Sequence, residues 1–239
     1  MPARQLPSRP GAATPRRGLN NSPLAIVLSP ACVLLIAAAL LAYALRWRAS
    51  GWGALVWLAC FVAMFAIRTP HSIRNRANVI VGARKGLDER LLLSGMFITM
   101  MVLPLLQLAT GAFGFADYRL PSWATWTGAL LQLPCLWLFW RSHADLGRNW
   151  SPGLEVRQEH QLITAGVYRR IRHPMYAAIW IAALTQPLLI HNWIAGALVI
   201  PAFAAMWLIR VPSEEAMMRA EFGSAYDDYC LRAGRLLPR

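Results

Sequence analysis

Charged residues are scarce in this chain of 239 residues. They make up 15% of the sequence and only 11 of them are acidic, whereas the hydrophobic set AVILMFWYC makes up 57%. An average soluble domain carries about 25% charged residues, so this composition excludes an ordinary soluble domain. It also excludes intrinsic disorder for most of the chain, because disordered segments have low hydrophobicity. The composition predicts an integral membrane protein.

Cysteine is also rare, with four residues in the chain. Cys32, Cys60 and Cys135 fall in apolar runs, and Cys230 lies in the polar segment after the last run. No two of them have the C-x-x-C spacing of a zinc or redox motif. The pattern therefore indicates neither a disulfide framework nor a metal site, and we expect no metal.

Six apolar runs lie along the chain. They cover residues 24–45, 52–67, 91–113, 122–140, 175–190 and 193–211. A membrane-spanning helix needs about 20 apolar residues, and backbone groups in lipid must be bonded within the protein, which favours helices. The runs predict an all-α, polytopic helical membrane protein with about six transmembrane helices. Two runs are short, and whether 52–67 crosses the membrane fully is left open.

The basic residues are concentrated in alternate segments between these runs. Of the 24 Lys and Arg residues, 21 lie in residues 1–23, 68–90, 141–174 and 210–239, which hold four, six, six and five of them. By the positive-inside rule these four segments face the cytoplasm, so we expect both termini to be cytoplasmic. The net charge of +13 is then a topological signal with some attraction to membrane lipids. It does not indicate a nucleic-acid partner.

The chain divides into three parts on this basis. Residues 1–23 are rich in Arg, Pro, Gly and Ser without an apolar period, and we expect a disordered cytoplasmic tail. Residues 24–140 are expected to form the N-terminal transmembrane helices. Residues 141–239 contain a helical hairpin and the two longest polar segments, so we expect a cytoplasmic site made from these two segments there.

The first polar segment ends in Arg172-His173-Pro174, directly before an apolar run. Because proline is favoured at the first position of a helix, we expect the helix to begin at Pro174. His173 would then lie at a helix N-terminus, where free backbone N–H groups attract anionic or hydroxyl groups of a ligand. An alternative is that the arginines here only anchor a helix end to lipid phosphates.

The second polar segment begins with Arg210 and Glu214, which are four residues apart. They share one helix face if the last helix continues past Pro212. Charged groups at the end of a span are costly near lipid unless they are paired or functional. The alternative is that Glu214 and Glu215 form a solvated helix face.

Several motifs within residues 141–239 together resemble a known family. They are L-G-R-N-W-S at 146–151, H-Q-L-I-T-A-G-V-Y-R-R-I-R-H-P-M-Y at 160–176, R-x-x-x-E-E at 210–215 and F-G-x-x-Y-x-x-Y at 222–229. In this combination they resemble the isoprenylcysteine carboxyl methyltransferase family, part of a wider group that includes phospholipid N-methyltransferases. The resemblance implies that residues 141–239 are a methyltransferase core with a C-terminal cytoplasmic cofactor-binding region. It also implies S-adenosyl-L-methionine as the methyl donor, bound without a Rossmann fold. In agreement, the sequence has no G-x-G-x-x-G after a strand.

The resemblance also implies roles for particular residues. It implies that Arg210 contacts the carboxylate of the methyl acceptor and that Arg210, Glu214 and Glu215 form the catalytic set. It implies a cofactor pocket made of His160, Gln161, Leu162, Ile163, Tyr168, Arg172, His173, Pro174, Met175, Tyr176 and Glu214. Which of Glu214 and Glu215 contacts the cofactor is left open.

The expected function is O-methylation of a carboxylate on an apolar, isoprenylcysteine-like partner. The first alternative is N-methylation of an aminophospholipid or S-methylation of a small thiol. The second is a membrane scaffold or transporter, which would line a path with polar residues in mid-span; the runs offer mainly Gln107, Gln132 and Gln186. Lysine occurs only at Lys85 among many arginines, which indicates a GC-rich bacterium and hence its inner membrane. The physiological acceptor and the oligomeric state stay open.

Overall fold

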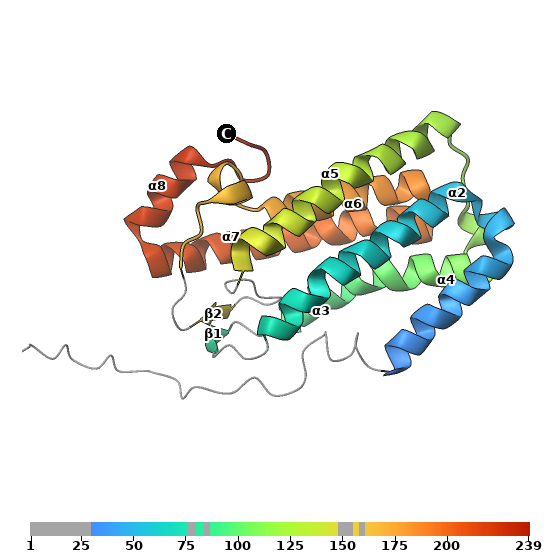
Figure 1. The fold of residues 1–239 in the computed structure, drawn as a ribbon, viewed down its shortest axis with the longest axis horizontal. Helices are drawn as coiled ribbons and strands as arrows, with labels where there is room; N and C mark the ends of the chain where they lie inside the picture. The colour runs from blue at the N-terminus through green and yellow to red at the C-terminus, as the bar shows by residue number, and fades with distance from the viewer. Residues whose placement is uncertain (1–29, 76–79, 84–86, 148–154, 158–160) are drawn as a thin grey trace, which may run out of the picture.

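The structure is a computed structural model in which residues 30–75, 80–83, 87–147, 155–157 and 161–239 are described. The helices form one bundle, in which most of them run side by side along one axis, while the last, short helix lies at an angle at one end (Figure 1). They are α2 (Pro30–Asn75), α3 (Leu87–Phe97), α4 (Leu103–Thr110), α5 (Ser122–Leu146), α6 (Pro174–Leu189), α7 (Val199–Phe222) and α8 (Ser224–Arg232). Short helical turns are η1 (Ile98–Val102), η2 (Gly114–Ala116), η4 (Gly166–Arg169) and η5 (Trp193–Ala197). The predicted N-terminal tail lies outside the described residues.

The helical membrane fold predicted from the apolar runs is confirmed. The break between the first two runs falls at Gly51 inside α2, where the backbone leaves the helical conformation (φ 72°, ψ 165°). Among the described residues, three helical segments are long and apolar enough to cross a membrane: Gly51–Ile73, Glu89–Thr110 and Trp193–Phe222. The expected number of six spans is therefore not confirmed.

The length of the second run is settled by the structure. The helix that contains residues 52–67 continues through Arg68 and Pro70 to Asn75. It is thereby long enough to span, which the apolar residues alone did not establish. By contrast, α6 has only 16 residues.

A small antiparallel sheet was not predicted. Strand β1 (Ile80–Ala83) pairs with β2 (Glu155–Arg157). The pairing joins two of the four basic segments at one end of the bundle (Figure 1). These segments therefore lie at the same end, as the alternation of charge along the chain requires.

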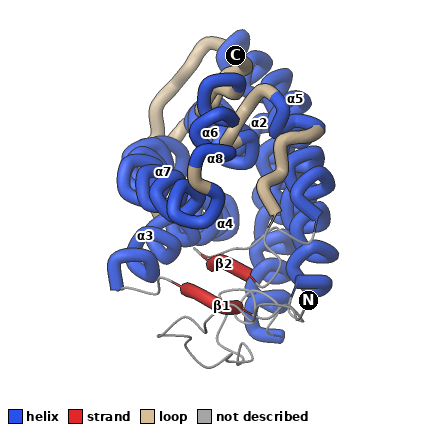
Figure 2. The backbone as a smooth tube through the Cα atoms, turned by 90° about the vertical axis from the view of Figure 1, so that its left-hand side faces the viewer, coloured by secondary structure: helices blue, strands red, loops and turns tan. Residues whose placement is uncertain are grey.

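The helices pack in two groups around α6. Viewed along the bundle, α3 and α7 lie on one side and α2 and α5 on the other (Figure 2). Small residues are fully buried where α5 meets α6, including Cys135 and Ala178. Close helix packing through small side chains is typical of membrane bundles, because lipid provides no hydrophobic driving force between helices.

The mid-span glutamines join helices to one another. Gln132 donates to the hydroxyl of Thr185 at 2.6 Å, and Gln186 accepts from the indole of Trp57 at 3.2 Å. Gln107 accepts a main-chain N–H from the loop that follows α4. Gln132 and Gln186 are also buried, with 4% and 1% of their surface exposed. Gln132 and Gln186 are therefore used in contacts between helices, whereas Gln107 holds the loop after α4.

Candidate active site

The site is centred on the N-terminal end of α6. As predicted, this helix begins at Pro174, with His173 immediately before it. The main-chain carbonyl of His173 accepts the N–H of Ala177 at 3.0 Å, while its side chain caps no backbone N–H of the helix. The imidazole is therefore available for contacts with another helix, and it is 9% exposed.

The loop before α6 is fixed to α5 by one aspartate. Asp145 accepts the N–H of Val167 at 2.9 Å, and Gly166 next to it has a positive φ of 61°. Tyr168 follows in the same turn, where its hydroxyl donates to a main-chain carbonyl of α5 and its own carbonyl accepts from Tyr229. Burial raises the pKa of the Tyr168 hydroxyl above its ordinary value. Tyr168 is thus a neutral packing residue that holds the loop in place.

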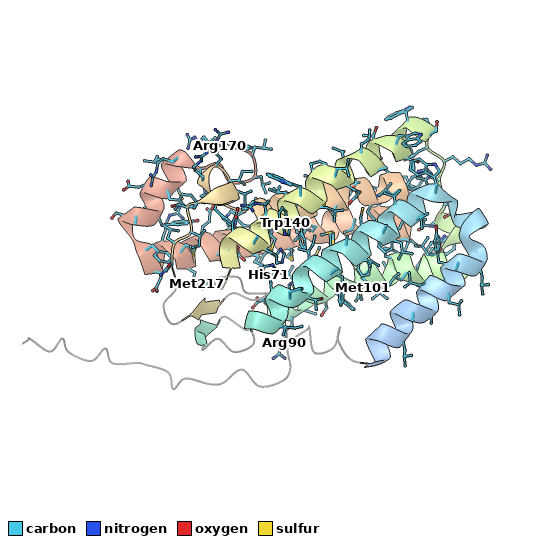
Figure 3. All side chains as sticks on the ribbon, viewed as in Figure 1. His71, Arg90, Met101, Trp140, Arg170 and Met217 are labelled. Atoms are coloured by element: carbon cyan, nitrogen blue, oxygen red, sulfur yellow. The ribbon has the colours of Figure 1, made fainter. Side chains whose placement is uncertain are left out.

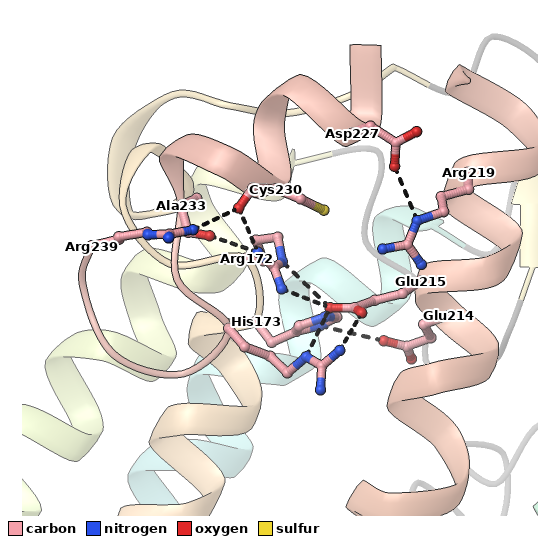
Figure 4. A network of polar contacts seen from close by, with 10 residues as sticks. Arg172, His173, Glu214, Glu215, Arg219, Asp227, Cys230, Ala233 and Arg239 are labelled. Carbon is pink, nitrogen blue, oxygen red and sulfur yellow. Dashed lines mark hydrogen bonds and ion pairs between the residues drawn. The ribbon is translucent and has the colours of Figure 1, made fainter. Parts of the chain in front are cut away.

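Glu215 is the centre of a network of three cationic or cation-forming groups (Figure 4). Its Oε1 lies 3.2 Å from Nη2 of Arg172, 3.2 Å from Nε2 of His173 and 3.1 Å from Nε of Arg235. Its Oε2 accepts from Nη2 of Arg235 at 2.6 Å. Only 2% of Glu215 is exposed. Both of its oxygens are therefore committed to the protein itself.

Glu214 has a different environment although it is the adjacent residue. Its Oε1 accepts from the hydroxyl of Tyr176 at 2.7 Å and from Nε of Arg210 at 2.9 Å. Its Oε2 lies 3.7 Å from Nδ1 of His173. The side chain keeps 22% of its surface exposed. Of the two glutamates, Glu214 is the one that a ligand can reach.

Arg210 shares a helix face with Glu214, as predicted, because α7 continues through Pro212 to Phe222. The guanidinium is 8% exposed. Its Nη1 also lies 3.7 Å from the carboxylate of Glu89, which α3 contributes from the other side. Two carboxylates thus neutralise this buried cation, and the bond from Glu214 to Nε fixes the direction of the guanidinium.

Aromatic rings continue from this polar network into the bundle between α6 and α7. His173 contacts the rings of Tyr176 and Trp207 edge-on, with centroids 5.7 and 6.0 Å away. Tyr176 stacks on Phe203 at 6.2 Å, and Phe203 contacts Trp180 at 4.9 Å. The charged groups are therefore bordered on the membrane side by an apolar aromatic surface.

The structure brings together six of the residues predicted for the site. They are Arg172, His173, Tyr176, Arg210, Glu214 and Glu215. His160 lies outside the described residues. The six converging residues come from two segments about 40 residues apart, so α6 and α7 must pack side by side to bring them together.

The other described residues predicted for the cofactor pocket lie in the loop before α6 and in the first turn of that helix. Gln161 is exposed, Ile163 is half-buried and Pro174 is buried. Leu162 packs beside Tyr226 and Tyr229, and Met175 packs against the cluster of Leu138 and Phe139. Leu162 and Met175 therefore contribute to packing around the site.

The motif F-G-x-x-Y-x-x-Y forms the turn from α7 into α8. Helix α7 ends at Phe222, Gly223 has a φ of 54°, and α8 follows directly. Tyr226 and Tyr229 are 2% and 4% exposed and pack against Phe222 and Leu162. Burial raises the pKa of Tyr229 to about 12. These tyrosines are core residues that attach α8 to the loop before α6.

Three residues at the site were not predicted from the sequence. They are Glu89 from α3, Trp207 from α7 and Arg235 from the segment after α8. For Glu89 a weak signal existed, since it is an acidic residue in a segment with six basic ones. For Trp207 and Arg235 the sequence offered no spacing that links them to the motifs.

Comparison with known proteins finds a match to one family. Residues 129–220 match the model of the isoprenylcysteine carboxyl methyltransferase family. This segment of the chain is therefore similar to that family. The predicted resemblance is thereby confirmed, and the chain is a methyltransferase.

Several individual proteins are similar to this chain over about two thirds of its length or more. A probable protein-S-isoprenylcysteine O-methyltransferase of Oryza sativa subsp. indica is 27% identical over 162 residues, which cover 66% of this chain and 83% of the relative. The protein-S-isoprenylcysteine O-methyltransferase of Schizosaccharomyces pombe is 27% identical over 164 residues, covering 62% and 70%. A solved structure of a eukaryotic Ras methyltransferase of this family has a TM-score of 0.41 at 18% identity, covering 77% of this chain and 62% of that chain.

The matched segment contains most of the candidate site of the methyltransferase. It runs from within α5 through α6 and most of α7. It therefore includes all six converging residues. Glu89 and Arg235 lie outside it, one before and one after.

Proposed function

We propose that the chain transfers a methyl group from S-adenosylmethionine to a carboxylate on an apolar, isoprenylcysteine-like acceptor in the membrane. The observation that carries this proposal is the position of Arg210. Its buried guanidinium is oriented by Glu214 at the point where the polar network meets the aromatic surface between α6 and α7. A carboxylate attached to an apolar chain needs a cation for its charged end and an apolar surface for its chain, and both meet at Arg210.

The residues around His173 are suited to hold the methyl donor. S-adenosylmethionine carries a positive sulfonium, a carboxylate, hydroxyls and an adenine ring. Glu214 retains exposed surface and offers a negative charge, and the N-terminus of α6 offers backbone N–H groups. Tyr176 and Trp207 offer aromatic faces that can contact the positive sulfonium. The set of side chains therefore fits this donor. Glu215, which also binds Arg172, contacts the imidazole of His173 and fixes its position.

Arg210 is suited to bind the acceptor. An arginine can bind a carboxylate through two parallel N–H···O bonds, and here the bond from Nε to Glu214 fixes the plane of the fork. A carboxylate of pKa about 3.5 is already ionised at neutral pH, so no residue has to act as a base. The main task of the protein is then to hold the two reactants in line.

The chemistry requires no proton transfer. The donor supplies a methyl group on a sulfonium: as the acceptor oxygen bonds to the methyl carbon, the S–C bond breaks and its electron pair stays on sulfur. Glu214 stabilises the positive donor before transfer, and Arg210 orients the acceptor oxygen. The aromatic side chains between α6 and α7 exclude water from the apolar side of the acceptor.

The test is methyl transfer from radiolabelled S-adenosylmethionine by the full chain in lipid. A farnesylcysteine analogue, phosphatidylethanolamine and a small thiol are offered side by side as acceptors. We expect base-labile label on the farnesylcysteine analogue, as for a methyl ester. Label on the amine or the thiol alone would contradict the carboxylate acceptor, and absence of both transfer and donor binding would contradict the proposed function altogether.

The role of Arg210 is tested in the same assay. Arg210→Ala should raise the acceptor's KM or lower kcat by about ten- to a hundredfold, the range expected for a lost bond between charged groups. The donor's affinity should stay near that of the wild type. Arg219→Ala is the matched control, because Arg219 lies on the same helix and forms an exposed ion pair with Asp227. An equal loss of donor affinity in Arg210→Ala would contradict this division of roles.

A further inference from the structure

The segment after α8 returns to the start of α6 and pairs with it. We call residues 233–239 the C-terminal strap. The N–H of Arg172 donates to the carbonyl of Gly234 at 2.7 Å, and the N–H of His173 donates to the carbonyl of Arg235 at 3.1 Å. The main chain of both site residues is therefore held by the strap.

Further contacts fix the strap on both sides. The N–H of Gly234 donates to the carbonyl of Arg170, which lies beside the C-terminal end in Figure 3. A side chain at position 234 would collide with the carbonyl of Leu237, so the strap can make this turn only with glycine there. The guanidinium of Arg172 donates to the carbonyl of Ala233 at 2.7 Å. The strap is thus bonded to the loop before α6 through main-chain and side-chain groups.

Arg235 extends from the strap to Glu215. It donates through Nε to Oε1 at 3.1 Å and through Nη2 to Oε2 at 2.6 Å, so the pair is bidentate. Glu215 is 2% exposed while Arg235 is 49% exposed. Arg235 therefore lies between this carboxylate and the solvent.

The two oxygens of Glu215 are used differently. Oε1 is shared by Arg172, His173 and Arg235, whereas Oε2 accepts from Nη2 of Arg235. Since a carboxylate is planar, fixing Oε2 also fixes the direction of Oε1. Loss of Arg235 would let the carboxylate rotate toward water, and the Oε1 contact with His173 would lengthen.

We propose that Arg235 is a positioning residue for the methyl-transfer site. It locks Glu215 and, through Glu215, holds His173 and Arg172 in the geometry that receives the methyl donor. The proposal rests on the proposed function. It adds to the site a residue that lies beyond the segment 129–220 by which the family is recognised.

The test compares three variants of Arg235 in the full chain, in lipid. Arg235→Gln removes the charge and Arg235→Ala also removes the side chain, while Arg235→Lys keeps a charge that can make one bond instead of two. Arg232→Gln is the matched control, because Arg232 is an exposed arginine three residues earlier whose Nε bonds the carbonyl of Asp228. For each variant we measure kcat, the KM of S-adenosylmethionine, the KM of the farnesylcysteine analogue and the melting temperature.

A positioning role predicts a specific pattern. Arg235→Gln and Arg235→Ala should raise the donor's KM by about ten- to a hundredfold, the range for a bond between charged groups. The acceptor's KM should change less than about twofold, and Arg235→Lys should recover part of the loss. Arg232→Gln should match the wild type.

Other outcomes would overturn the proposal. Equal kinetics in Arg235→Gln and Arg232→Gln would show that Arg235 does not position the site. A lower melting temperature with unchanged KM values per folded molecule would assign Arg235 a purely structural role. If the wild type neither binds nor uses the donor, the proposed function fails first and this inference falls with it. If the wild type transfers methyl groups but the Arg235 variants have unchanged kinetics, the inference is refuted while the proposed function stands.

Discussion

Glu214 and Glu215 are adjacent in sequence, yet the structure predicts opposite consequences when each is changed to glutamine. Glu215→Gln removes the charge at the centre of Arg172, His173 and Arg235. Glu214→Gln removes a charge that is partly exposed, and an amide oxygen can still accept the bonds of Tyr176 and Arg210. We therefore expect Glu215→Gln to lower stability and Glu214→Gln mainly to lower activity.

The magnitudes follow from burial. Removing one partner of a buried ion pair costs about 3–5 kcal/mol. Arg235 is half exposed, and Arg172 keeps its bonds to the carbonyls of Cys230 and Ala233, so we expect the lower value, about 3 kcal/mol for Glu215→Gln. In Glu214→Gln the amide oxygen can still accept from Arg210, and Glu89 still neutralises that buried guanidinium, so we expect a loss of about 0–1 kcal/mol, as for a partly exposed pair. For a chain of this size, these values correspond to about 6–12 °C and about 0–4 °C in melting temperature.

The assay is thermal unfolding of the two purified variants in the same detergent, together with methyl transfer per folded molecule at a temperature where both are folded. Glu214→Gln should unfold within a few degrees of the wild type and lose about tenfold in transfer at a donor concentration below KM, because it no longer binds the positive sulfonium with a negative charge. Equal melting temperatures for the two variants, or a larger decrease for Glu214→Gln, would refute the assignment of Glu215 as the buried anchor.

Two further predictions concern the acceptor and the loop before α6. With a carboxylate acceptor, kcat/KM should vary little between about pH 6 and 9, whereas an amine acceptor must lose a proton first and its rate would climb with pH; a steep rise with the farnesylcysteine analogue would contradict the mechanism. Gly166→Ala should cost at least about 1–2 kcal/mol, because φ is 61° there and the new methyl group would collide with Asp145. Gly95→Ala is the control, since Gly95 lies in α3 with open space around its Cβ position, and it should be neutral or stabilising in the same thermal assay. Equal destabilisation by both would show that the loop is not strained at Gly166.

The sequence predicted local features of the fold well. The start of α6 at Pro174 followed from the preference of proline for the first position of a helix. The contact between Arg210 and Glu214 followed from their spacing on one helix. Such features depend on neighbours within about one helical turn, so a pattern in the sequence contains them.

Features that depend on distant segments could not be predicted in this way. Glu214 and Glu215 differ because Glu215 faces Arg172 and Arg235, which come from two other segments. Glu89 reaches Arg210 only because α3 packs against α7. The pairing of β1 with β2 likewise joins residues that are more than 70 positions apart. No periodicity in the chain determines these partners, since each depends on how the helices are arranged around α6.

The length of α6 has a consequence for the depth of the site. With 16 residues, α6 is about 24 Å long, which is about 6 Å less than the hydrocarbon thickness of a bilayer. Its neighbour α7 belongs to a helical segment of 30 residues, and Arg210 and Glu214 lie within that segment. If the far end of α6 lies at one edge of the hydrocarbon, the charged groups at its start lie about 6 Å inside the opposite edge. Under the proposed function, an acceptor whose apolar chain stays in the lipid could then present its carboxylate to Arg210 without leaving the membrane, so the energy of extracting a lipid into water would not enter the barrier to reaction.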